Sequence, residues 1–408
     1  MTRVALVCPE PLGHRHPAGV GIRFLELARL LRSSGLEVEL LSPDGGSVEG
    51  CRAARITPAT LREATGRADS VLVQGHAIND LLAHGVERPL VVDLYDPYVI
   101  ENFHYLEGHG EKVFLHDHAT LMASLRAGDC FLCASEAQRM FHAGLLLSVG
   151  RINPLLYASD PTARSLLRTV PFGVQPPRRR TSDGLESREI FFGAIYDWYE
   201  PRIAIEAIAI ARRRDPRLTL TFTHHPNAET TPQSLFGRTR ALVDAKGLGA
   251  AVRFVPWVAY EDRGSFYDRF ALALLTFRPS LETDLAMRTR MFDCFWGGLP
   301  VITSSAGGSD PVIAEYRSGT VVAGQEPERY ADALLAMLDS PERYREAVKG
   351  CARFVADHQW ERLARPLVEF CRAPRRDPTR EAFATPPPIG GRSEPLLRRL
   401  GRRLRGHG

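Results

Sequence analysis

The stretch Glu282–Gly308, ETDLAMRTRMFDCFWGGLPVITSSAGG, predicts a helix followed directly by a strand. Asp284 is expected to cap the first turn, and Leu285–Trp296 contains neither glycine nor proline. The Gly-Gly-Leu-Pro that follows supplies a stop, and the apolar run PVITS predicts a strand. A helix that feeds a buried strand is a building unit of α/β folds.

The same helix is predicted to bind an anion at its amino end. Arg288 and Arg290 lie where free backbone N–H groups and the helix dipole favour a negative ligand. Asp293 lies further along and accepts hydrogen bonds, so it suits a pair of sugar hydroxyls. A phosphate and a polyol held by one helix indicate a nucleotide. The alternative is that Arg290 and Asp293 form a surface ion pair worth about 0.2–0.5 kcal/mol.

Composition sets the broad class of the protein. A chain of 408 residues, 44% hydrophobic and 25% charged, is expected to form two globular domains. A net charge of +4 is too small to indicate nucleic acid. No run approaches 18 apolar residues and the start lacks the pattern of a signal peptide, so a cytoplasmic location is expected. The seven cysteines are scattered, and the one CxxC, Cys130 and Cys133, lies in an apolar run, so buried thiols and no metal are expected.

Strand and helix patterns alternate along both halves of the chain, which predicts two Rossmann-like α/β domains facing each other across a cleft. The first helix is predicted at Gly19–Arg32, and the linker in the Pro- and Arg-rich segment QPPRRRTSDGLESRE. The expected boundaries are residues 1–174 for the first domain, 175–189 for the linker, 190–357 for the second domain, 358–372 for a terminal helix, and 373–408 for a basic, disordered tail.

Four motifs in this order carry a family resemblance. They are PAGVGIRFLELARLLRSSGLEVELLSP, PFGV at Pro171–Val174, the segment from Asp293 to Pro300, and QWERLARPLVEF near Gln359. Together they resemble family four of the retaining glycosyltransferases with the GT-B fold, over nearly the whole chain up to about residue 372. The resemblance implies transfer of a sugar from a nucleotide diphosphate sugar to a hydroxyl acceptor, with retention of anomeric configuration and without a metal or other cofactor. It also implies that residues 1–174 form the acceptor-side domain, that residues 190–357 bind the nucleotide sugar, and that the helix at 358–372 crosses back to the first domain.

Two departures from the family pattern affect the charge of the predicted site. The family commonly has two glutamates eight positions apart; here Asp293 fills the second place and Leu285 the first. Glu282 and Asp284 are the acids available to contact the donor sugar instead. The family also commonly has an Arg and a Lys after the first strand of the second domain, which GAIYDWYEPR lacks. We therefore expect Arg288 and Arg290 to bind the diphosphate.

Backbone groups and aromatic side chains complete the predicted donor site. Gly307 and Gly308 are expected to offer N–H groups to the departing diphosphate, beside the catalytic Arg288 and Arg290. Gly19 and Gly21 are expected to let the backbone approach the ligand. Their spacing falls short of GxGxxG, which argues against NAD. Trp257 is predicted either to stack on the nucleobase or to belong to the core.

Three residues at strand ends are candidates on the acceptor side. Asp96 is expected to contact the sugar face opposite the phosphate, with a turn acid before Pro97 as the alternative. Asp93 ends the same strand, and His76 ends the strand before it. These two are predicted to face the acceptor.

The sequence leaves two alternatives for the end of the chain and several for the function. Leucines and arginines near the end can share a short basic amphipathic helix, which predicts either peripheral contact with the inner face of the plasma membrane or a solvated tail. The expected partners are the nucleotide-sugar donor and a hydroxyl acceptor, with no nucleic acid. The alternatives are a nucleotide-sugar epimerase, a non-catalytic nucleotide-sugar-binding protein and, more remotely, a nicotinamide oxidoreductase.

Overall fold

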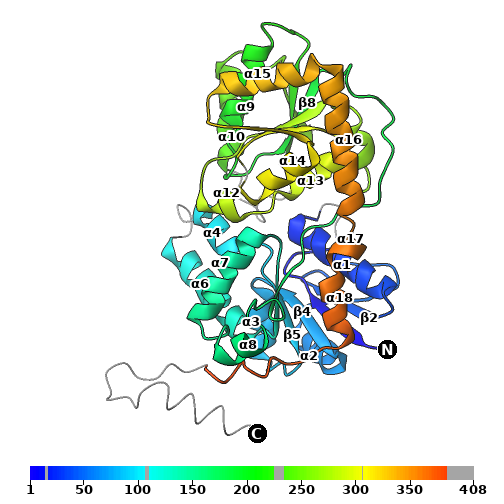
Figure 1. The fold of residues 1–408 in the computed structure, drawn as a ribbon, viewed down its shortest axis with the longest axis vertical. Coiled ribbons are helices and arrows are strands. Elements are labelled where there is room, and N and C mark those ends of the chain that lie inside the picture. The colour runs from blue at the N-terminus through cyan, green and yellow to red at the C-terminus, as the bar shows by residue number, and fades with distance from the viewer. Residues whose placement is uncertain (14–16, 106–109, 225–233, 306, 384–408) are drawn as a thin grey trace.

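The fold was analysed in a computed structural model of the chain. The structure describes residues 1–13, 17–105, 110–224, 234–305 and 307–383. Within them the chain forms two α/β domains stacked end to end, the first below the second in Figure 1. The architecture expected from the sequence is confirmed.

The first domain is built on a seven-stranded parallel sheet in the order β3-β2-β1-β4-β5-β6-β7. Its strands alternate with helices, and the strands other than β3 and β7 are largely buried, which explains their almost continuous apolar runs. The elements are β1 (Arg3–Val7), α1 (Gly19–Ser33), β2 (Glu37–Ser42), β3 (Arg52–Arg55), α2 (Pro58–Arg67), β4 (Ser70–Gln74), α3 (Ala77–Ala83), β5 (Leu90–Asp93), α4 (Tyr98–Glu101), η1 (Asn102–Tyr105), α6 (Glu111–Ala127), β6 (Cys130–Cys133), α7 (Glu136–Ser148), α8 (Pro154–Ser159) and β7 (Leu167–Thr169).

The second domain repeats this plan with a six-stranded parallel sheet in the order β10-β9-β8-β11-β12-β13. Its strand order reverses between β8 and β11, as that of the first sheet does between β1 and β4, and ligands of open α/β sheets bind at such points. The elements are β8 (Glu189–Ala194), α9 (Pro201–Ala211), β9 (Thr219–His224), α10 (Ser234–Ala245), β10 (Val252–Pro256), α11 (Arg263–Tyr267), β11 (Leu272–Leu275), α12 (Leu281–Leu285), α13 (Thr289–Trp296), β12 (Val301–Ser304), η2 (Gly307–Ser309), α14 (Asp310–Tyr316), β13 (Gly319–Val322) and α15 (Pro327–Leu338).

Two crossings join the domains. The segment between β7 and β8, which contains the predicted linker, leads upward, and α16 (Pro341–Asp357) runs back down into α17 (Trp360–Leu363) and α18 (Arg365–Arg372) on the first domain (Figure 1). The two crossings touch where Val174 pairs in parallel with Gln359. Trp360 is buried against Phe172, with ring centroids 5.0 Å apart.

A buried arginine fixes α1 against the sheet of the first domain. The guanidinium of Arg23 donates to both oxygens of Asp93, at 2.6 and 3.2 Å, and both side chains are fully buried. It also donates to the carbonyl oxygens of Val170 and Pro171. One side chain therefore ties the first helix, the end of β5 and the segment after β7 together beneath the junction of the domains.

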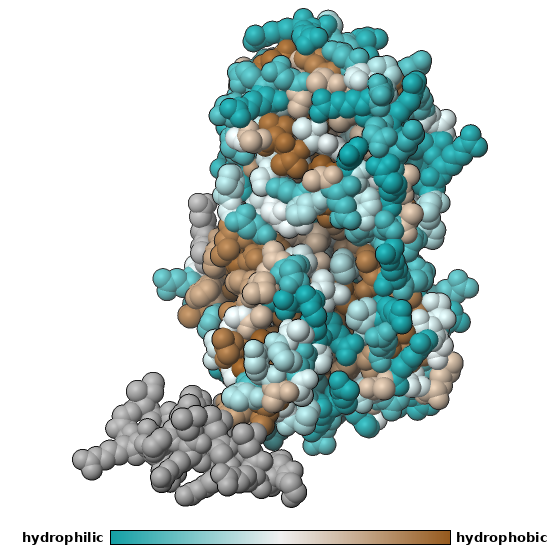
Figure 2. All heavy atoms as spheres, in the orientation of Figure 1, coloured by the Kyte–Doolittle hydropathy of each residue, from teal (hydrophilic) through white to brown (hydrophobic). Residues whose placement is uncertain are grey.

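The outer helices of the first domain keep several large hydrophobic side chains on the surface. Figure 2 shows hydrophobic side chains over α6 and α7, and Leu115, Met140 and Leu147 are each exposed by about 60%. Among the described residues, no helix has the length and apolar character needed to cross a membrane.

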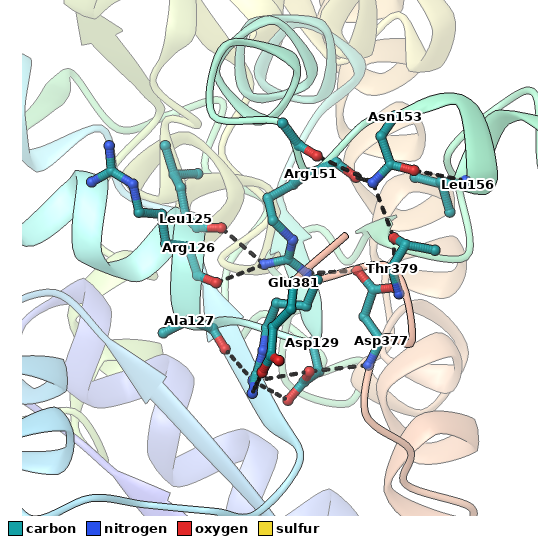
Figure 3. A network of polar contacts seen from close by, with 12 residues as sticks. Leu125, Arg126, Ala127, Asp129, Arg151, Asn153, Leu156, Asp377, Thr379 and Glu381 are labelled. Carbon is teal, nitrogen blue, oxygen red and sulfur yellow. Dashed lines mark hydrogen bonds and ion pairs between the residues drawn. The ribbon is translucent and has the colours of Figure 1, made fainter. Parts of the chain in front are cut away.

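The predicted tail starts as an anchored strap rather than as a free chain. The Arg151 guanidinium donates to Asp377 at 2.7 Å, with both side chains almost fully buried, and Asn153 donates to Thr379 (Figure 3). Asp129 accepts from the N–H of Asp377 and from the Arg380 guanidinium. The expectation of disorder from residue 373 is thus wrong for the described residues up to 383, because buried polar groups of α7, β6 and their loops need these partners. The predicted amphipathic helix lies outside the described residues.

Candidate active site

A cavity of about 260 Å³ lies between the two domains and is lined by both. A smaller cavity of about 70 Å³ continues from it, since Trp257, Arg290 and Asp293 line both. The lining of the larger one comes from loops after β1, β5, β8 and β10 and from the start of α13, at the carboxyl ends of the strands. Its described residues include Glu10, Pro17, Ala18, Gly19, Tyr95, Asp96, Tyr98, Glu101, Phe172, Tyr196, Trp198, Trp257, Arg288, Arg290 and Asp293.

The helix predicted from Leu285 to Trp296 is two helices, which corrects the role of Asp284. Ser280 caps α12 by accepting from the N–H of Thr283, and Asp284 lies exposed inside that short helix. The chain then leaves helical geometry at Ala286 and re-enters it at Thr289. Asp284 is therefore not the cap of α13, and it is not among the described residues that line the cavity.

Arg288 is paired with an acid of the same segment, which corrects the roles of both residues. Its guanidinium donates to the two oxygens of Glu282 at 2.9 and 2.8 Å, and to the Thr283 hydroxyl at 3.0 Å. Arg288 is 6% exposed and Glu282 2%. Glu282 does not line the cavity, and the charge that Arg288 brings to it is largely neutralised.

Arg290 is the positive group that remains for a ligand. It has no ion pair with a carboxylate among the described residues, and its guanidinium carbon lies 5.4 Å from the centre of the Trp257 ring. Gly193, with φ +96°, makes room for it: a Cβ there would lie 2.7 Å from Cδ of Arg290 and still closer to Nη1. The bulge of β8 at this glycine thus exists beside the arginine.

Asp293 faces both cavities from the next turn of α13 and is 30% exposed at its side chain. Arg263 approaches it at 3.8 Å. The Arg263 guanidinium lies over the rings of Tyr260 and Trp296, at 3.6 and 4.6 Å from their centres. The aromatic rings thus fix Arg263, and Arg263 lies beside Asp293, whose partly exposed oxygens can accept hydrogen bonds from a polyol.

The glycines at the start of α1 are used differently from the prediction. The N–H of Gly21 donates to Glu10 at 2.8 Å, so it is not free for a ligand. A Cβ at Gly21 would lie 2.8 Å from the same oxygen, and this explains the glycine. Gly19 does line the cavity, beside the Tyr95 hydroxyl.

Burial raises the pKa of Glu10 to about 7. The sequence analysis missed Glu10 because no local pattern joins it to α1.

Two of the predicted acceptor residues do not face the cavity. Asp93 is fully buried in its ion pair with Arg23, so it positions α1 and cannot contact an acceptor. His76 lies outside the cavity, with Nε2 2.9 Å from Asp117 and its ring stacked on His116. Asp96 does line the cavity, and its carboxyl is hydrogen-bonded to that of Glu101, which the sequence analysis also missed.

Gly307 and Gly308 support α12 instead of lining the cavity. A Cβ at Gly307 would meet the backbone of Thr283 and Asp284, and Gly308 lies beside Ser135. Ser309, at the end of the same turn, accepts from the N–H of Arg288 at 3.3 Å. The turn therefore fixes the segment before α13, and the prediction that these two glycines bind phosphate is corrected.

Comparisons with known proteins agree with this architecture. Residues 187–340 match the family model described as glycosyl transferases group 1. A curated relative from Catenulispora acidiphila, D-inositol 3-phosphate glycosyltransferase 2, is 30% identical over 220 residues, which cover 49% of each chain. The corresponding protein from Frankia alni is 27% identical, covering 53% of this chain and 54% of its own. The chain thus spans about half the length of the curated relatives that it matches.

Solved structures match over almost the whole chain. The Anabaena protein Alr3699/HepE, solved with UDP-glucose, has a TM-score of 0.66 at 14% identity, with 91% of this chain and all of that chain covered. Sucrose-phosphate synthase from Thermosynechococcus elongatus has a TM-score of 0.63 at 17% identity, with 91% and 98% covered. Residues 187–340 of this chain are therefore similar to the group 1 glycosyl transferases, and the whole chain has the two-domain GT-B fold of the matching structures.

Proposed function

We propose that the protein is a glycosyltransferase that moves a sugar from a nucleotide diphosphate sugar to a hydroxyl acceptor, with retention of anomeric configuration and without a metal. The observation that carries the proposal is Arg290. It is the guanidinium of the interdomain cavity that is not neutralised by a described carboxylate, and it lies at the amino end of α13 one turn from Asp293. The group 1 match over this domain and the nucleotide-sugar complex of a structural neighbour support it.

Each part of the donor has a complementary group in the two cavities. The diphosphate is assigned to the Arg290 guanidinium at the amino end of α13, where the helix dipole adds to the guanidinium charge. The ribose hydroxyls are assigned to Asp293. The nucleobase is assigned to the smaller cavity, against Trp257, where buried polar atoms of Arg263 and Thr223 have no hydrogen-bond partner among the described residues.

The chemistry follows from the charge that develops as the sugar leaves. Breaking the anomeric C–O bond places negative charge on the departing diphosphate, which Arg290 and the helix end are placed to stabilise. Preorganised groups of this kind are usually the largest contribution to catalysis, and loss of one donor costs roughly 100-fold or more in rate. The same positive charge is what a metal ion would supply, which is why the proposal includes none.

The test is ligand-dependent thermal stability with a panel of nucleoside diphosphates and their sugars. We expect at least one of them to raise the melting temperature, because a ligand that binds only the folded state stabilises it. Asp293→Asn, which leaves one neutral acceptor, should weaken binding by roughly 10- to 150-fold, the value of about 1.5–3 kcal/mol for hydrogen bonds to charged groups. Arg290→Ala should weaken it at least as much.

Arg329→Ala is the matched control, since this arginine is exposed and contacts only Glu326 and a carbonyl oxygen among the described residues. It should bind like the wild type. Unchanged affinity in both site variants would refute the placement of the donor. Donor binding without transfer or donor hydrolysis would instead favour the non-catalytic alternative, and conversion of the sugar without an acceptor would favour the epimerase.

Peripheral membrane contact is a further part of the proposal. Two features of the described residues support it. The helices α6 and α7 carry exposed hydrophobic side chains, and the strap ends beside them, since Phe383 lies against Gly150, just after α7. The basic segment that follows leaves the described structure near this hydrophobic surface. Flotation with vesicles containing anionic lipid should therefore carry the full chain more strongly than residues 1–383.

A further inference from the structure

Two carboxyl groups touch each other on the first-domain wall of the cavity. Asp96 follows β5, Glu101 ends α4, and both line the cavity. Their side chains are hydrogen-bonded to one another. A hydrogen bond between two carboxyl groups requires a proton on one of them, since two ionised carboxylates can only accept.

Arg288 is the positive group beside this pair, and its charge is shared with Glu282. The nearest acids are Asp93 and Glu282, and each is already paired with its own arginine, Arg23 or Arg288. Neither Asp96 nor Glu101 has an ion pair among the described residues. The titratable and charged groups that face the pair are Glu10, Asp93, Tyr95, Tyr98, Glu282 and Arg288.

Burial decides which partner carries the proton. It raises the pKa of Asp96 to about 6 and raises the pKa of Glu101 well above its ordinary value, with the neighbouring acids adding to the latter shift. At neutral pH, Glu101 is therefore protonated and Asp96 ionised.

The second-domain wall opposite this pair carries a further sign that the cavity takes a ligand. Arg288, 6% exposed, has a buried Nε without a hydrogen-bond partner among the described residues, and it lines the cavity beside the carboxyl pair. Buried polar atoms without partners are rare in folded proteins unless a ligand or water satisfies them.

We propose that Glu101 is a positioning residue, whose protonated carboxyl donates a hydrogen bond to Asp96 and holds it as an ionised acceptor toward the transferred sugar. Asp96 then accepts from a sugar hydroxyl, and its charge opposes the positive charge that develops at the anomeric carbon. No bond to Asp96 or Glu101 forms or breaks in this role. The inference rests on the proposed function, since it needs a sugar in the cavity.

The first test is the pH dependence of kcat/KM for transfer or donor hydrolysis in two variants. Glu101→Gln keeps a neutral donor beside Asp96, so its acidic limb, the fall of kcat/KM on the acid side of the pH profile, should remain near pH 6. Glu101→Ala removes the donor, which raises the pKa of Asp96; its acidic limb should move up by about one pH unit, equivalent to a tenfold loss of rate on that limb. An unmoved limb in Glu101→Ala, or equal shifts in both variants, would overturn the proposal.

The second test does not depend on turnover. At pH 7.5 the infrared spectrum of the wild type minus that of Glu101→Gln should contain one C=O band of a protonated carboxyl group, and its absence would overturn the assignment. Melting temperatures of the variants establish that both are folded. If no nucleotide diphosphate binds the wild type, the proposed function fails, and the Glu101 role fails with it even where the infrared band shows the shared proton.

Discussion

Replacing Gly193 by alanine tests the placement of Arg290 without removing the arginine. The glycine has φ +96°, a conformation that costs other residues about 1–3 kcal/mol. The new Cβ would lie 2.7 Å from Cδ of Arg290, whereas ordinary contact begins at 3.4 Å. Nη1 of the guanidinium would lie closer still, so the guanidinium must move by about an ångström, and a misplacement of this size costs on the order of 100-fold in rate.

The assay measures donor affinity by titration calorimetry and transfer or donor hydrolysis by steady-state kinetics, below the melting temperature of the variant. We expect Gly193→Ala to lose rate on the order of 100-fold, as a variant lacking the arginine would. Gly144→Ala is the matched control: it lies in α7, exposed, with no described heavy atom within 4 Å of the added Cβ. It should retain activity and gain up to about 1 kcal/mol in stability.

A folded Gly193→Ala protein that binds and turns over donor like the wild type would refute this reasoning. It would show that the position of Arg290 seen beside β8 does not matter for the ligand. A loss of folding alone is separated from this outcome by the melting curve, and Arg290→Ala, which leaves Gly193 unstrained, then provides the same comparison.

Three further predictions concern the strap, the Glu10 carboxyl that accepts from α1, and the metal. Asp377→Ala leaves the buried Arg151 guanidinium without its partner, so it should lower the free energy of unfolding in urea by about 3–5 kcal/mol. Asp339→Ala, which breaks an exposed pair with Arg214, is the control and should change the free energy of unfolding by less than about 1 kcal/mol. Equal effects of the two substitutions would contradict the structural role of the strap. Burial raises the pKa of Glu10 from 4.5 to about 7, so the folded state holds this proton more tightly than the unfolded state. Stability should therefore fall as pH rises from 4.5 to 7, on the order of 1–3 kcal/mol relative to Glu10→Gln, while the exposed Glu49→Gln follows the wild type; parallel curves for all three would exclude the shift. Excess EDTA should leave the transfer rate unchanged, and a loss that Mg²⁺ or Mn²⁺ restores would contradict the metal-free proposal.

The site was only partly predictable from the chain, and the reason is visible in particular residues. The order Arg288, Arg290 and Asp293 at a helix start is a local pattern, and the structure places all three on the cavity. The contacts that these residues make could not be read from their spacing. The break at Ala286 turns Glu282 back onto Arg288, and Gly307 supports that turn instead of facing a ligand. Propensity alone favoured one unbroken helix because nothing between Leu285 and Trp296 breaks it.

The acceptor side depended even more on contacts between distant segments. Asp93 and Asp96 are three residues apart, yet one is buried against Arg23 and the other lines the cavity. Whether a strand-end acid faces a ligand is decided by the helix that packs over it, here α1, from far away in sequence. No sequence motif marks Glu10 or Glu101, because the groups that they contact belong to other elements of the fold.

Alternation of apolar strands with amphipathic helices was sufficient, by itself, to determine two parallel α/β domains, since both patterns report burial that the local chain already encodes. Only the tertiary structure decided which charges stay free. Pairing removes Asp93 and the Gly21 N–H from a ligand's reach and neutralises most of the charge of Arg288, and it leaves Arg290 and Asp293 facing the ligand. The physical reason is that a buried charge takes whichever partner folding brings within hydrogen-bond distance, and sequence spacing does not record that distance.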